Sequence, residues 1–168
     1  MSITMYQASV PVLQKMLTNL SGILGKAAAY AQERKIDPAV LLATRLFPDM
    51  FPLVRQVQIA ADFAKGAGAR LAGVEVPSFP DTEESFAELQ ERIAKTQAFL
   101  AGLSPAQIDG SEERPITIKV HVMELNFKGL DYLTAFALPN FYFHMTAAYA
   151  ILRMSGLDLG KKDFVGPV

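Results

Sequence analysis

Apolar residues recur every three or four positions along most of the chain, which is the spacing of one face of an α-helix. The clearest series follows Thr4, whose distance from Gln7 is typical of a helix capping box, and it runs to about Arg34. We therefore predict a first long helix over this segment. Its apolar positions are Tyr6, Val10, Leu13, Leu17, Leu20, Leu24 and Ala28.

Start and stop signals predict three more helices before residue 110. Asp37 followed by Pro38 is typical of a helix start and predicts a short helix to about Leu46. Asp49 is the expected cap of a longer helix that ends at Gly73. After a stiff connector over 76–80, Asp81 is the expected cap of a third long helix that ends at Gly102.

The period changes to two over residues 114–128. Apolar Ile116, Ile118, Val120 and Val122 alternate with Thr117, Lys119 and His121, which predicts a half-buried strand with His121 on its polar face. A second short strand over 125–127, with a turn near Glu124, would complete a hairpin.

The remaining pattern is helical again. We expect residues 130–138 to be helical and Pro139 to start or kink a last long helix, which ends near Ser155 and Gly156. The polar tail after Gly160 is expected to fold over the surface or onto a partner. Four long helices with one hairpin before the last describe a mainly α, four-helix bundle, and we expect residues 1–168 to form one domain.

Composition narrows the function classes. The chain has 168 residues, no cysteine, and 16 Lys and Arg against 17 Asp and Glu, which excludes disulfides and argues against a nucleic-acid footprint. No apolar run approaches the roughly 18 residues of a membrane helix, and the N-terminus has no secretory pattern, so we expect a cytoplasmic protein without membrane contact. The apolar share of 51% leaves room for a buried homodimer interface.

Candidate chemistry is concentrated in the last long helix. Asn140 and His144 are four residues apart and therefore share one face of that helix. This spacing can present two side chains to one metal ion or one small molecule. Neither a nucleophile elbow nor a glycine-rich phosphate loop occurs in the sequence.

Several motifs resemble a known family. His144, the pair Leu152-Arg153 and Gly156 resemble the closing helix of the DinB/YfiT-like metalloenzyme superfamily. Nearly the whole chain is similar to an uncharacterised bacterial domain-of-unknown-function family within that superfamily. The segments that carry this similarity are Arg45-Leu46-x2-Asp49-Met50, Gln56-Val57-Gln58-x3-Asp62, Phe136-Ala137-Leu138-Pro139-Asn140-Phe141-Tyr142-Phe143-His144 and Gly160-Lys161-x-Asp163-Phe164.

The resemblance implies a bundle fold and, in typical members, three histidines that bind a divalent metal. It places Gln58, Asn140 and His144 where those histidines would stand. Asp62 or Asp49 could add a carboxylate. Amide oxygens are poor replacements for imidazole on a transition metal, so we expect a degenerate metal site and no cofactor.

Three hypotheses follow. In the first, Gln58, Asn140, His144 and Asp62 belong to a neutral polar pocket that binds a small molecule or a partner; the three neutral side chains could equally satisfy one another as a buried network. In the second, His144 ligates a divalent metal in a transferase or isomerase acting on a thiol or similar small cosubstrate. In the third, the chain is a dimeric partner-binding protein that uses its last helix and tail. Whether the protein is an enzyme stays open.

Overall fold

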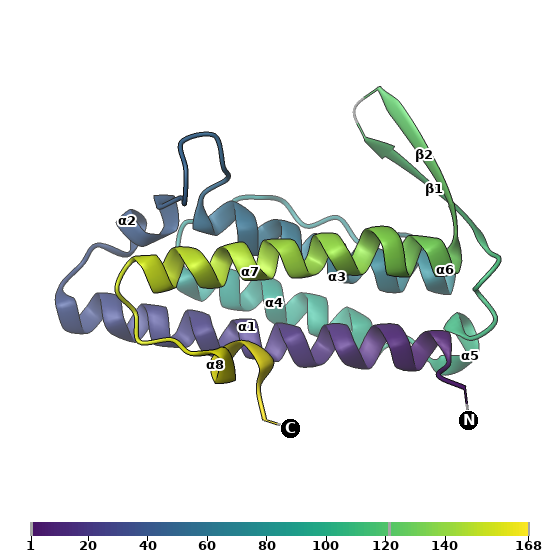
Figure 1. Ribbon diagram of the computed structural model, residues 1–168, viewed down its shortest axis with the longest axis horizontal. Helices are drawn as coiled ribbons and strands as arrows, with labels where there is room; N and C mark the ends of the chain where they lie inside the picture. Colours follow the sequence, from purple (N-terminus) through teal and green to yellow (C-terminus); the bar gives the residue numbers. More distant parts are fainter. Residues whose placement is uncertain (1, 121, 168) are drawn as a thin grey trace.

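The computed structural model describes residues 2–120 and 122–167, and its main body is a bundle of long helices with a hairpin that projects from one end (Figure 1). Within these residues the elements are α1 (Met5–Arg34), α2 (Pro38–Ala43), α3 (Leu53–Ala72), α4 (Phe86–Ala101), α5 (Pro105–Ile108), β1 (Pro115–Val120), β2 (Met123–Lys128), α6 (Gly129–Asp131), η1 (Tyr132–Ala137), α7 (Leu138–Met154) and α8 (Lys161–Val165).

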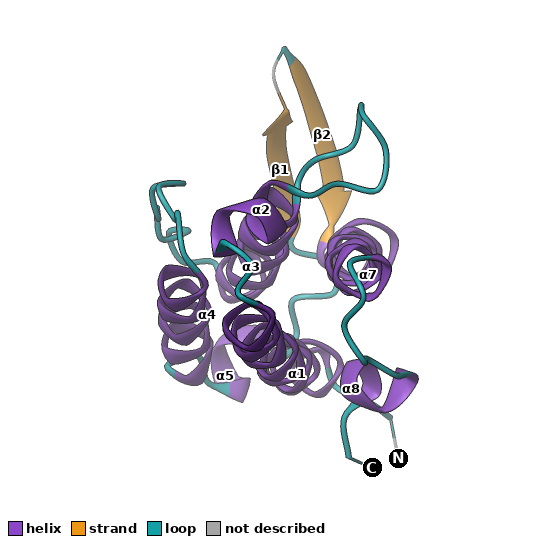
Figure 2. Ribbon diagram, turned by 90° about the vertical axis from the view of Figure 1, so that its left-hand side faces the viewer, coloured by secondary structure: helices purple, strands orange, loops and turns teal. Residues whose placement is uncertain are grey.

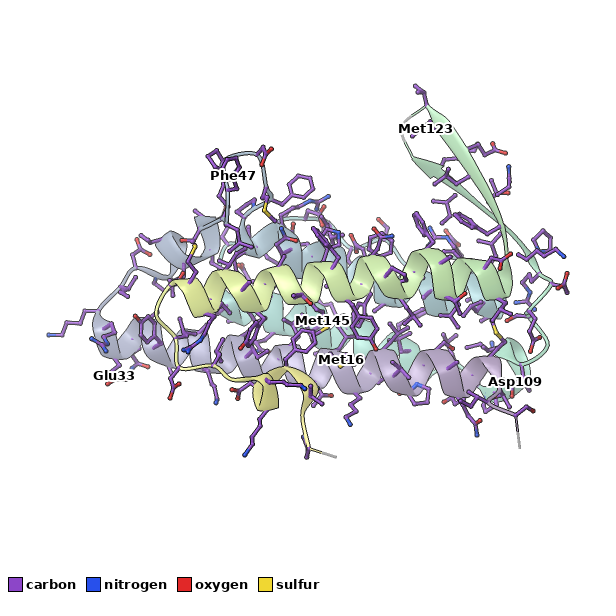
Figure 3. All side chains as sticks on the ribbon, in the orientation of Figure 1. Met16, Glu33, Phe47, Asp109, Met123 and Met145 are labelled. Carbon is purple, nitrogen blue, oxygen red and sulfur yellow. The ribbon has the colours of Figure 1, made fainter. Side chains whose placement is uncertain are left out.

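Four long helices, α1, α3, α4 and α7, surround the core (Figure 2). Helix α3 packs against both α4 and α7, and α1 packs against α4. The apolar face predicted for the first helix points into this core, where Leu13, Leu17 and Leu20 are fully buried. Met16 of α1 and Met145 of α7 are buried where these two helices face each other (Figure 3). The predicted mainly α bundle is confirmed.

Two predicted helix starts are wrong. Helix α2 ends at Ala43, and α3 begins at Leu53 after Pro52, so Asp49 lies in an exposed turn between them. Helix α4 begins after Ser85, whose side chain accepts a hydrogen bond from the backbone of Glu88, and Asp81 is no cap. Ser85 is a second start signal a few residues after Asp81, whereas α3 begins after Pro52 without a side-chain cap. Asp81 instead enters ion pairs with arginines.

The predicted hairpin is confirmed, but its first strand ends earlier and its second strand is longer than expected. Strands β1 and β2 pair antiparallel from Pro115 opposite Lys128 to Val120 opposite Met123, so the expected turn near Glu124 is wrong. A connection of two residues joins the strands, which is the usual length for a tight hairpin and sets their pairing register. Val122 belongs to this connection and is 99% exposed, whereas His121 lies outside the described residues.

The helical prediction for residues 130–138 is confirmed, but the helix widens there. Residues Tyr132–Ala137 form a π-helical turn, in which the backbone N–H of Leu138 donates to Leu133 five residues earlier. Pro139 has no N–H to donate to the carbonyl of Ala135, and a wider turn relieves that missing bond. Pro139 lies in the first turn of α7, as the expected start requires, and the helical backbone of η1 runs into it without a break.

The tail folds onto the bundle, as expected. Helix α8 packs against α1 (Figure 1), where Lys26 pairs with Asp163 at 2.6 Å and Asn19 donates to the carbonyl of Phe164 at 3.0 Å. Within residues 2–120 and 122–167, no helix combines the length and apolar character that a membrane crossing requires.

Candidate functional site

His144 lies on the face of α7 that packs against α3, and it is 9% exposed. Its Nδ1 is 2.7 Å from Oε1 of Gln56, and Nε2 of Gln56 donates to the carbonyl of Phe51 at 3.1 Å. A backbone carbonyl can only accept, so the amide nitrogen of Gln56 must face Phe51 and its oxygen must face His144. Nδ1 of His144 therefore carries the proton, and Nε2 presents a lone pair.

Aromatic rings enclose this imidazole. The ring of Phe63 on α3 stacks on it with centroids 5.9 Å apart at 16°, and Phe143 meets it edge-on at 5.2 Å. Burial, and to a smaller degree the positive charge of Arg55, lower the pKa of His144 below its ordinary value. The imidazole is consequently neutral at neutral pH.

Asn140 lies one turn before His144 and is half-buried. Its Nδ2 donates to the carbonyl of Phe136 at 2.7 Å, which leaves Oδ1 available as an acceptor. Phe136, Asn140 and His144 form one stripe along η1 and α7, because residues four apart share a helix face. Phe63 spans this stripe, since its ring also meets that of Phe136 at 5.7 Å.

We call this set the α3–α7 seam, defined by Gln56, Phe63, Phe136, Asn140 and His144. A cavity of about 190 Å³ adjoins it. The cavity shares the rings of Phe63 and Phe136 with the seam, and its remaining wall comes from Asp62 and Arg70 of α3 and from Ile118 of the hairpin.

Gln58 and Asp62 belong to a different group of side chains. Gln58 donates to Glu83 at 2.8 Å and accepts from Arg55 at 3.2 Å. The expected mutual network of Gln58, Asn140 and His144 is therefore wrong, because each of the three has its own separate partner. The hydrogen-bond partner of His144 is Gln56, two positions before Gln58 in the same motif.

Arg92 of α4 is the centre of this second group. Its guanidinium contacts Asp62 at 2.7 Å, Asp81 at 2.9 Å and Glu83 at 2.9 Å, while its side chain is 1% exposed. Burial alone would raise the pKa of Glu83, but hydrogen bonds from Arg92 and Gln58 lower it below its ordinary value. We call this set the Arg92 network; it consists of Arg55, Gln58, Asp62, Lys65, Asp81, Glu83 and Arg92.

The donor set fits a divalent metal poorly. His144 offers one imidazole nitrogen, whereas Asp62 is already paired with Arg92 and with Lys65 at 2.8 Å. Over residues 2–120 and 122–167, no three His, Cys, Asp or Glu side chains are grouped so that they could hold a metal ion. Asp49, the other carboxylate considered, lies exposed in the turn before α3.

Sequence reasoning missed Gln56, Phe63 and Arg92. A signal for the first two existed, because residues seven apart in a helix lie on nearly the same face. Gln56 and Gln58 are two apart and point in nearly opposite directions, so only one of them can reach α7. Arg92 carried no signal of its own within the helical pattern of α4.

Comparisons with known proteins agree with this architecture. The profile of a domain of unknown function, DUF1993, matches residues 5–165. A crystal structure described as a DinB family member protein from Shewanella denitrificans is similar, with 42% sequence identity and a TM-score of 0.87 over 97% of this chain and 92% of that chain. No curated protein matches the chain. The chain thus belongs to the DUF1993 family and has the DinB-like fold.

Proposed function

We propose that this protein is a cytoplasmic binding protein that holds a small organic molecule at the α3–α7 seam, without a resident metal. One observation carries the proposal. The hydrogen bonds from His144 to Gln56 and from Gln56 to Phe51 fix a neutral imidazole whose Nε2 lone pair has no partner among the described residues. A fixed acceptor between aromatic walls, beside a cavity, is the usual composition of a small-molecule site.

The size of the cavity limits the ligand. An apolar cavity of about 150 Å³ holds one benzene molecule, and drug-sized ligands occupy about 300 Å³ or more. The cavity beside the seam, at about 190 Å³, is suited to one ring or two fused rings.

The metal-dependent alternative needs a second strong ligand beside His144. Asp62 could supply one only by leaving both Lys65 and Arg92, and Arg92 is a buried cation. Separating a buried ion pair costs several kcal/mol, on the order of 3–5. The chemistry of these donors therefore favours binding of an organic molecule over a metal-dependent transfer.

A fragment screen tests the proposal. One- and two-ring aromatic fragments should bind, by ligand-observed NMR, and should shift the imidazole signals of His144. The variant Ile118→Arg should abolish binding because its side chain fills the cavity mouth. Thr117→Arg adds the same charge on the opposite face of β1 and should leave binding intact.

Elemental analysis of the natively purified protein separates the two functions. Under our proposal the metal content stays at background in both the wild type and His144→Ala. Near one equivalent of nickel, zinc, iron or manganese that is lost in His144→Ala would instead support the metal-dependent enzyme. The binding function would be overturned if no fragment bound, or if every fragment that bound the wild type also bound Ile118→Arg.

We also propose that two copies associate through the side of the bundle that carries the hairpin. Phe47 in the loop before α3 and Met123 at the tip of the hairpin both project from this side (Figure 3), and Phe47, Phe51, Val122 and Met123 are all exposed. Light scattering should give about twice the chain mass of 18.3 kDa. Phe47→Asp with Phe51→Asp should give a monomer, whereas Ile3→Asp, at another exposed apolar residue, should not. A wild-type monomer at high concentration would refute the association.

A further inference from the structure

We propose that Arg70 recognises a carboxylate of the bound molecule, so that the ligand is a small aromatic carboxylic acid in its ionised form. This inference rests on the proposed function and adds the chemical class of the ligand. The cavity is lined by Asp62, Phe63, Arg70, Ile118 and Phe136. Because two of these residues carry opposite charges, the class of ligand depends on which of the two charges is already compensated.

Asp62 already has two cationic partners. Its carboxylate lies 2.8 Å from Nζ of Lys65 and 2.7 Å from a guanidinium nitrogen of Arg92, and the side chains of both cations are buried. In the Arg92 network as a whole, three cations face three carboxylates: Arg55, Lys65 and Arg92 against Asp62, Asp81 and Glu83. A cationic ligand at Asp62 would bring a fourth cation to charges that are already balanced.

Arg70 has no carboxylate partner among residues 2–120 and 122–167. Its Nη1 donates to the hydroxyl of Tyr132 at 3.2 Å, and its guanidinium lies 5.9 Å from the centre of the same ring. Burial raises the pKa of Tyr132 despite the opposing charge of Arg70, so the phenol is neutral and supplies no counter-charge. Of the two charges at the cavity, that of Arg70 is the uncompensated one.

The surroundings of Arg70 suit an aromatic carboxylate. A guanidinium offers a planar fork of N–H donors that matches the two oxygens of a carboxylate. Phe63, Ile118 and Phe136 supply apolar and aromatic walls for the rest of the ligand. Asp62 lies eight residues from Arg70 along α3, which is about 12 Å of helix, so a carboxylate held at Arg70 lies far from it.

Gly66 makes room for the guanidinium of Arg70. It lies one turn before Arg70 in α3, and a Cβ atom at this position would overlap Nη1 of Arg70. Alanine is the better helix former, so Gly66→Ala should leave α3 folded and move only the flexible tip of Arg70. This variant keeps every charge of the protein and displaces the one that we assign to the ligand.

Three probes of nearly the same shape test the charge class. Benzoate, benzamide and benzamidinium are each a single ring with a planar substituent, and they carry a negative charge, no charge and a positive charge. Calorimetric titration of the wild type should show benzoate binding about tenfold tighter than benzamide, the effect of charge-assisted hydrogen bonds, and benzamidinium binding most weakly. Added sodium chloride should weaken the binding of benzoate and leave that of benzamide unchanged.

Matched variants locate the effect at Arg70. Arg70→Gln, which keeps a donor but removes the charge, should abolish the preference for benzoate, and Gly66→Ala should reduce it. Arg34→Gln makes the same change of charge at an exposed position near the end of α1 and should retain the preference. Circular dichroism checks that each variant is folded.

Equal affinities of the wild type for benzoate and benzamide, or tighter binding of benzamidinium, would overturn the anionic class while leaving the binding function intact. A preference for benzoate that persisted in Arg70→Gln would overturn the assignment of Arg70. If none of the three probes bound, the anionic class would also be overturned, whereas the wider fragment screen would decide the binding function.

Discussion

Replacement of Arg92 by methionine is expected to lower the free energy of unfolding by about 3 kcal/mol, because it removes the buried cation shared by three carboxylates and leaves Glu83, whose side chain is 10% exposed, with no ion pair among the described residues. Arg92 contacts Asp62, Asp81 and Glu83, and its own side chain is 1% exposed. Asp62 and Asp81 keep 36% and 38% of their side-chain surface in water, which places the estimate at the lower end of the usual range. Urea unfolding monitored by circular dichroism measures the loss.

A neighbouring cation on the same helix provides the control. Lys95 is exposed on α4, and Lys95→Met should change stability by no more than about 0.5 kcal/mol. In a double-mutant cycle, Arg92→Met should cost less when Asp62 is already asparagine, because one uncompensated charge has been removed. A loss below about 1 kcal/mol in Arg92→Met would show that the three contacts do not act as one network.

The Arg92 network also bears on the site. It ties the connector between α3 and α4 to both helices through Asp81 and Glu83. In addition it occupies Gln58 and Asp62, the two residues of α3 that the family resemblance places near a metal. Glu83 and the two arginines hold these groups, and the hydrogen bond of His144 goes to Gln56 instead. The network thus holds Asp62 in ion pairs, and the positive charge of its Arg55 helps to lower the pKa of His144.

Most of the fold could be predicted from the sequence because packing follows periodicity. The four long helices and the hairpin each have a clear period, and burial of one face fixes their type. The start of α4 differs from the prediction because two capping signals lie close together. Ser85, whose side chain accepts from the backbone of Glu88, is the cap, because the carboxylate of Asp81 forms ion pairs with Arg55 and Arg92 instead. Such a preference depends on a tertiary contact that the local sequence does not contain.

The site was predicted only in part, for a geometric reason. His144 and Asn140 do share a face of α7, as their spacing requires. On α3 the prediction chose Gln58 and Asp62, which are four apart and face the Arg92 network, whereas Gln56 and Phe63 face α7. The side chains of residues two apart on a helix point in directions that differ by about 200°. Choosing Gln58 in place of Gln56 therefore selects the opposite face of α3. The rotation of α3 relative to α7 decides this, and it is a tertiary property.

Replacement of Gln56 by methionine is expected to lower the free energy of unfolding by about 2 kcal/mol and to change the tautomer of His144. Methionine has a similar length but cannot accept strongly from Nδ1, so whichever tautomer His144 adopts leaves a buried ring nitrogen unpaired. The loop carbonyl of Phe51 also loses its donor, although water can reach it because Phe51 is exposed. In a His121→Ala background a single imidazole remains, and ¹⁵N NMR should show one Nδ1–H tautomer for Gln56 and a mixture for methionine.

Gln58→Met is the matched control, because Gln58 is the same residue type, equally buried and two positions along α3. It removes the hydrogen bond to Glu83 and the one from Arg55, but Glu83 keeps its contact with Arg92 and Arg55 keeps its ion pair with Asp81, so we expect a loss of less than about 1 kcal/mol. The tautomer of His144 should not change. If Gln58→Met altered the tautomer and Gln56→Met did not, α3 would present its other face to α7, and the neutral seam on which the proposed binding function depends would not exist. Comparison of the two glutamine variants therefore tests whether Gln58, as the spacing predicts, or Gln56, as the packing of α3 on α7 indicates, is the partner of His144.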